Sequence, residues 1–187
     1  EFKFLGTTLW TKIDDIHKKH ISSNINDYHL IYTGEGKSKF TTDSSNELHS
    51  FNIKWLEEEI KKSDKPCVVL THHAPLFNDP ANGNYTASQR YTYSENNQAF
   101  HNDLSHMLKK PIILWGFGHT HHSTKFMFNG VTILSNQLGY QFESTGFDPI
   151  MEVNLTKHIK PKEIEITDPT SDNFGDAPEK IVLKKSD

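Results

Sequence analysis

Cysteine is nearly absent from this sequence, in which Cys67 is the single cysteine among 187 residues. One cysteine cannot form a disulfide within the chain, so internal disulfides are excluded. No apolar run approaches the roughly 20 residues that a membrane-spanning helix needs, which excludes such a helix. Arginine is equally scarce, with Arg90 alone, and no basic block is present. We therefore expect neither a membrane nor a nucleic acid as partner, and we expect a cytoplasmic protein.

Histidine, in contrast, is abundant, with 12 residues in a chain of formal net charge -4. Hydrophobic residues make up 34% and aromatic residues 11% of the chain, which is typical of a globular domain with a real core. The composition turns polar and richer in proline near the carboxyl end. We predict one domain over residues 1–156, followed by a polar tail or edge-strand extension over residues 157–187.

Short apolar runs alternate with amphipathic segments along the chain. Apolar spacing predicts helices over residues 48–60 and 99–108, and each helix precedes an apolar strand. The predicted strands cover residues 2–10, 67–70, 112–117, 124–128, 131–134 and 150–155. Asn129-Gly130 predicts a tight hairpin turn. Apolar strands that alternate with helices predict an α/β fold with a parallel sheet.

Two histidine runs follow two of these apolar strands directly. Thr71-His72-His73-Ala74-Pro75 follows residues 67–70, and Gly118-His119-Thr120-His121 follows residues 112–117. In open α/β sheets, ligands bind just beyond the carboxyl ends of the strands. Neutral imidazole is a good ligand for divalent metal ions. The spacing therefore predicts a metal site at this edge of the sheet.

The histidine runs and their flanking strands resemble the calcineurin-like metallophosphoesterase family. Residues 68–75 and 115–121 match two of its metal motifs, and the resemblance extends from about residue 5 to residue 153. Three further segments support it, namely residues 6–10, 26–31 and 136–140. Gln137 departs from this pattern, since relatives often have proline in that turn.

The resemblance implies a four-layer α/β/β/α sandwich, of which this chain would be the carboxyl-terminal part, with the amino-terminal portion missing. It implies two divalent ions (Zn, Mn, Fe or Mg) and hydrolysis of a phosphate ester by a metal-activated hydroxide. Carried over by position, His73 and His119 would bind one ion and His121 the other. His72 and His122 are interpreted as polar neighbours. Arg90 either contacts phosphate or lies in a solvated loop.

The acidic motifs of that family are missing from the chain, namely its Asp-x-His, Gly-Asp and Gly-Asn-His-Glu motifs. Asp27-Tyr28-His29 has the Asp-x-His form but follows a polar segment. We interpret it as part of the family's Asn-Asp-Tyr segment and not as a metal site. Gly175-Asp176 lies among turn-forming residues and is interpreted as a turn.

Three hypotheses account for a predicted metal site that lacks the acidic motifs of the family. The chain is an enzyme completed by an upstream segment, or one chain of a two-chain enzyme, or a non-catalytic metal-binding or interaction remnant of the fold. An apolar parallel sheet that begins in mid-domain favours the first two. We expect further polypeptide to pack against residues 2–10 and 67–70.

Overall fold

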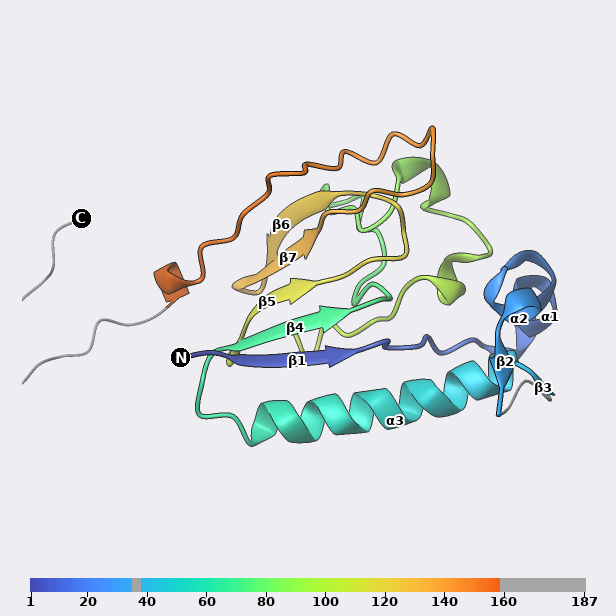
Figure 1. The fold of residues 1–187 in the computed structure, drawn as a ribbon, viewed down its shortest axis with the longest axis horizontal. Coiled ribbons are helices and arrows are strands. Elements are labelled where there is room, and N and C mark those ends of the chain that lie inside the picture. The colour runs from blue at the N-terminus through green and yellow to red at the C-terminus, as the bar shows by residue number, and fades with distance from the viewer. Residues whose placement is uncertain (35–37, 159–187) are drawn as a thin grey trace, which may run out of the picture. The chain divides into compact units, whose positions relative to one another are not determined.

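The computed structural model describes residues 1–34 and 38–158 of the chain (Figure 1). The chain divides into two compact units, Glu1–Glu152 and Val153–Asp187. The second unit is described as far as His158 and contains a 3-10 turn at Thr156–His158. Most of the expected tail, including Gly175-Asp176, lies outside the described residues, and the boundary at residue 156 stays a prediction.

A five-stranded sheet forms the centre of the first unit. Its strand order is β1-β4-β5-β7-β6, with neighbours parallel except β6 and β7, which are antiparallel. The strands are β1 (Lys3–Thr7), β4 (Cys67–Thr71), β5 (Ile112–Gly116), β6 (Thr124–Phe128) and β7 (Val131–Ser135). This mostly parallel sheet confirms the predicted α/β class.

Three α-helices lie between β1 and β4, namely α1 (Asp15–Asn24), α2 (Asp27–Leu30) and α3 (Thr42–Lys61). A small antiparallel pair, β2 (Tyr32–Thr33) and β3 (Ser38–Lys39), lies between α2 and α3. Within the described ranges, no helix is long and apolar enough to cross a membrane.

Helix α3 contains the predicted helix of residues 48–60 and extends along the β1 side of the sheet (Figure 1). It begins where the Thr41 hydroxyl accepts a hydrogen bond from the Ser44 backbone N–H at 3.1 Å. Leu56 is fully buried in the main core, together with Val69, Trp115 and Ile133 from three strands. This packing holds the carboxyl ends of the strands in fixed positions.

The predicted hairpin is confirmed by β6 and β7. Asn129 and Gly130 connect the strands with φ of 48° and 79°. Both values lie in the left-handed region, as a type I′ turn requires, and asparagine and glycine tolerate it best.

Two predicted elements are wrong. Residues 99–108 begin at the end of a 3-10 turn, Asn97–Ala99, and continue as irregular backbone rather than as an α-helix. The Asn102 and Leu104 N–H groups donate to the carbonyls of Ala74 and Pro75, each at 2.9 Å, so they are not free for helical bonds. Residues 150–155 form no strand.

One face of the sheet is apolar and partly open. The pairing register places Phe4 of β1, Leu70 of β4 and Met127 of β6 on this same face. Their side chains are 61%, 49% and 57% exposed. Apolar side chains this exposed on three strands leave a surface to which further polypeptide can bind.

Candidate metal centre

The loops that follow β1, β4 and β5 meet at the carboxyl edge of the sheet, where the histidine runs were predicted to gather. His72 and His73 follow β4, and His119 and His121 follow β5. The loops are joined by backbone hydrogen bonds. The Gly118 N–H donates to the His72 carbonyl at 3.0 Å, and the His73 N–H donates to the Thr8 carbonyl at 3.2 Å.

His73 is fully buried at this edge. Its Nδ1 lies 3.1 Å from the Thr8 carbonyl oxygen. Because a carbonyl can only accept, Nδ1 carries the proton and Nε2 carries a lone pair. This Nε2 is buried without a hydrogen-bond partner among the described residues. Its ring packs against Trp10, with centroids 5.1 Å apart, and this contact fixes its orientation.

His119 presents a second nitrogen of the same kind. Its Nε2 is also buried and has no hydrogen-bond partner within the described ranges. The ring stacks on Phe100 with centroids 4.5 Å apart, and the centroid of the His73 ring also lies 4.5 Å from it. The backbone φ of 68° is in the left-handed region, which is uncommon for a non-glycine residue. Strained backbone of this kind is often found at functional sites.

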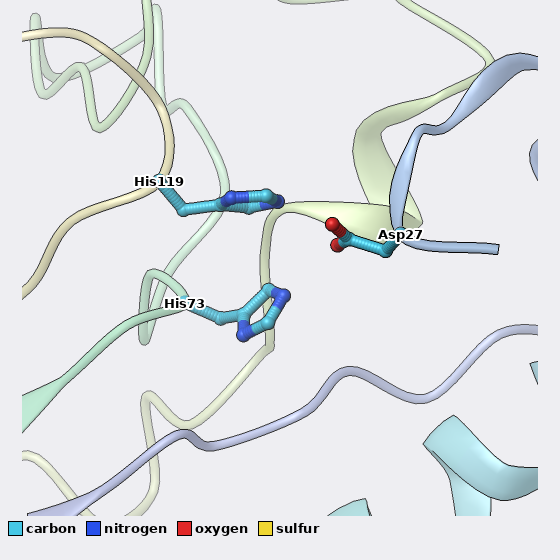
Figure 2. A group of neighbouring side chains, drawn as sticks. All are labelled: Asp27, His73 and His119. Carbon is cyan, nitrogen blue, oxygen red and sulfur yellow. The ribbon is translucent and has the colours of Figure 1, made fainter. Parts of the chain in front are cut away.

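Asp27 faces both histidines from across the site (Figure 2). One carboxylate oxygen of Asp27 and one ring nitrogen each of His73 and His119 lie within 4.8 Å of one another. Asp27 is the first residue of α2, and the next residue, Tyr28, is buried with its ring stacked 5.8 Å from Phe40. That packing places the carboxylate at the histidines.

Burial sets the protonation states in this group. It lowers the pKa of His73 to about 3, and together with the neighbouring imidazoles it lowers the pKa of His119 to about 2. Burial also raises the pKa of the Asp27 carboxyl above its usual value. Both imidazoles are therefore neutral at pH 7, which is the form that binds metal ions.

Two neutral imidazoles and one carboxylate are a common ligand set for Zn²⁺ and other divalent ions. The unpartnered Nε2 atoms of His73 and His119 fit this role, because a buried lone pair without a partner is costly. We name this group, Asp27, His73 and His119, the triad. It can hold a divalent metal ion.

His121 is not a member of the triad, although it lies in the wall of the same cavity. Its Nδ1 lies 2.7 Å from Glu143 Oε2, and its ring packs edge-on against Tyr140 with centroids 4.6 Å apart. The predicted role of His121 as a ligand of a second ion stays a prediction.

The other predicted residues lie beside the triad histidines or in the cavity wall. The His72 ring lies 4.5 Å from the His119 ring and 5.0 Å from the His73 ring. His122 and Arg90 lie in the cavity wall, and the exposed Arg90 guanidinium packs 4.5 Å over the Tyr91 ring.

The cavity has a volume of about 760 Å³. Aromatic and polar side chains line it together with Asp27, His119 and His121. A cavity of this size is typical of small-molecule sites.

Sequence reasoning missed three residues here. Asp27 was set aside because the segment before it is polar, but α2 carries it to the triad. His101 lines the cavity, is buried, and has an Nε2 atom without a partner in the part of the chain that the structure describes. Glu143 pairs with His121. The Asp-x-His pattern was the one sequence feature that pointed to Asp27. No sequence feature pointed to His101 or Glu143.

Comparisons with known proteins find a sequence relative and a structural likeness. No family model matches the chain. An uncharacterized protein of Acanthamoeba polyphaga mimivirus is 46% identical over 157 residues, which cover 83% of this chain and 56% of that protein. The chain thus spans about half the length of the curated relative that it matches. The crystal structure of a phosphopantetheinyl hydrolase from Mycobacterium tuberculosis has a TM-score of 0.47 at 15% identity, over 68% of this chain and 43% of that one.

Proposed function

We propose that this chain carries part of the active site of a metal-dependent phosphoesterase. The observation on which the proposal depends is the triad, in which a ring nitrogen of each histidine and a carboxylate oxygen of Asp27 lie within 4.8 Å of one another, and both Nε2 atoms are buried without a partner among the described residues. The position of both histidines at the carboxyl edge of a parallel sheet supports it, since ligands bind there. The resemblance of residues 68–75 and 115–121 to metallophosphoesterase motifs supports the choice of phosphate ester as substrate.

In this proposal Asp27, His73 and His119 hold one divalent ion, and His121 contributes to a second. Zn, Mn, Fe and Mg are the candidate metals. A bound divalent ion supplies positive charge that stabilises a phosphoryl oxygen and lowers the pKa of water. The protein keeps His73 and His119 neutral by burial, and it fixes their rings through the Thr8 carbonyl and the Phe100 ring.

Arg90 gives the cavity a cationic group that suits the substrate. It is the only arginine of the chain and lies in the cavity wall. A guanidinium can donate two parallel hydrogen bonds to a phosphate group. We propose that Arg90 binds the phosphate of the ester, while Tyr91 holds its side chain in place.

We also propose that further polypeptide completes the site, either as an upstream segment of the same protein or as a second chain. A pair of divalent ions needs more than the one carboxylate of the triad to balance its charge. The open apolar face at Phe4, Leu70 and Met127 supports a second layer there, as in a four-layer α/β/β/α sandwich. The intact mass of the protein from its natural source tests whether an upstream segment exists. If it does, the mass must be well above 21.5 kDa. If the mass is 21.5 kDa, co-purification of a second chain tests the other form.

Hydrolysis of p-nitrophenyl phosphate and bis(p-nitrophenyl) phosphate, with each candidate metal in turn, tests the function. We expect metal-dependent turnover that EDTA abolishes. His73→Ala and His119→Ala should each lower the turnover rate by at least about 100-fold, as removal of catalytic groups does. His106→Ala, at an exposed histidine that lies 3.8 Å from Glu57 and belongs neither to the triad nor to the cavity wall, is the matched control. Metal binding without turnover, by the chain and by its natural form, would favour the non-catalytic remnant.

A further inference from the structure

The segment that follows β7 folds back over the loop that carries His121. We name this segment, residues 136–146, the return loop. It contacts His121 at two separate points, through Gln137 at the backbone and through Glu143 at the ring. Neither contact was anticipated from the histidine motifs.

Glu143 contacts the ring of His121 with its carboxylate. Oε2 lies 2.7 Å from His121 Nδ1, and it accepts a second hydrogen bond from the Tyr140 backbone N–H at 2.8 Å. An ionised carboxylate can only accept, so His121 Nδ1 must carry the proton. In the neutral ring the lone pair of His121 is then on Nε2, the one ring nitrogen left to bind a metal ion or a substrate.

Gln137 contacts the backbone of His121. Its Oε1 accepts the His121 N–H at 2.7 Å, while its Nε2 donates to Ser135 Oγ at 2.8 Å and to Thr120 Oγ1 at 3.0 Å. Gln137 is 8% exposed, so these bonds are shielded from water. They hold the backbone of His121 at a φ of 48°. This value lies in the left-handed region, which is energetically unfavourable for a non-glycine residue.

Gly139 makes the turn of the return loop possible. Its φ is 70°, and a Cβ at this position would lie 2.6 Å from Glu143 Oε2 and 2.5 Å from Thr145 Cγ2. A side chain at this position would be strained at this φ and would force Glu143 Oε2 and Thr145 Cγ2 to shift. Gly139 thus leaves the space in which Glu143 pairs with His121.

We propose that Glu143 is a positioning residue that sets the tautomer and the ring orientation of His121, while Gln137 fixes its backbone. A histidine that binds metal commonly donates its other ring N–H to a carboxylate, which orients the ring and makes the ligand nitrogen more basic. The use of Nε2 for a metal ion rests on the proposed function. The tautomer itself does not, because it follows from the contact with Glu143.

The tautomer of His121 in the metal-free protein provides the test. Long-range ¹H–¹⁵N spectra of protein labelled at histidine distinguish Nδ1–H from Nε2–H, and His121→Asn identifies the signals of His121. We expect Nδ1–H in the wild type at pH 7.5 and a loss of that preference in Glu143→Ala. Glu143→Gln keeps an oxygen that can accept from Nδ1–H and should retain the tautomer. Glu152→Ala, at an exposed acid of the same unit, is the control.

A wild-type His121 protonated on Nε2, or an unchanged His121 spectrum in Glu143→Ala, would overturn the proposal. Calorimetric titration with Zn²⁺ then measures the consequence for the site, where we expect affinity to fall about 10- to 100-fold in Glu143→Ala and less in Glu143→Gln. Equal Zn²⁺ affinity in all three proteins would overturn the link between Glu143 and metal binding. A wild type that holds the Nδ1–H tautomer but binds none of Zn²⁺, Mn²⁺, Fe²⁺ and Mg²⁺ would refute the proposed function, while the role of Glu143 in setting the tautomer would stand.

Discussion

Acidification should destabilise the metal-free protein, because His73 and His101 are buried as neutral imidazoles. Burial lowers the pKa of His73 to about 3 and the pKa of His101 to about 4 in the folded chain. In the unfolded chain, the pKa of both returns to about 6.5. Below pH 6.5 the unfolded chain therefore binds protons that the folded chain does not, and stability falls with pH until the folded pKa is reached.

The expected effect is large compared with the stability of a typical domain. Each histidine lowers the free energy of unfolding by up to about 1.4 kcal/mol per pH unit below pH 6.5. Integrated from pH 7.5 to pH 5.0, the loss is about 2 kcal/mol per histidine, so His73 and His101 together lose about 4 kcal/mol and the buried His119 adds about 2 kcal/mol. A typical domain is stable by only about 5–15 kcal/mol.

Urea unfolding followed by tryptophan fluorescence, in EDTA at pH 7.5, 6.0 and 5.0, measures this loss. Replacing His101 removes one of these buried groups, so His101→Phe should lose about 2 kcal/mol less than the wild type over this range. His106→Gln, at an exposed histidine, is the matched control and should keep the wild-type loss. If His101→Phe and the wild type lose the same stability, the reasoning about buried neutral histidines is refuted.

Three further predictions follow from the site and the core. Asp27→Asn should weaken Zn²⁺ binding by at least about 10-fold in calorimetric titration, because it removes the one carboxylate of the triad; unchanged affinity would exclude Asp27 as a ligand. Wild-type protein with Zn²⁺ at 100 times its Kd should gain about 2.7 kcal/mol in urea unfolding, and EDTA should reverse the gain; no gain would argue against a metal site. Leu108→Ala should lower the free energy of unfolding by about 2–5 kcal/mol in the same assay because Leu108 is fully buried, and a loss below 1 kcal/mol would contradict its place in the core.

The central strands and the hairpin could be predicted because their signals are local. An apolar run such as residues 112–115 has few options other than a buried strand, and the structure buries all four residues. Asn129-Gly130 predicts its turn because left-handed φ values are easiest for these two residues. The same local signals placed the loops of His73 and His119 at one edge of the sheet.

Residues whose position depends on distant contacts could not be predicted in this way. Asp27 reaches the triad because Tyr28 packs on Phe40, and the sequence before Asp27 carries no sign of this. Residues 99–108 have helical spacing, but their backbone N–H groups bond to the loop after β4 instead. In both cases a tertiary contact outweighs the local preference.

A crystal structure of the protein grown with Zn²⁺, with anomalous scattering measured at the zinc absorption edge, tests the central claim most directly. We predict an anomalous peak about 2.0–2.2 Å from His73 Nε2, from His119 Nε2 and from an Asp27 carboxylate oxygen. A peak bound only elsewhere on the protein, or no peak between these three side chains at saturating Zn²⁺, would contradict the claim that the triad is a metal centre.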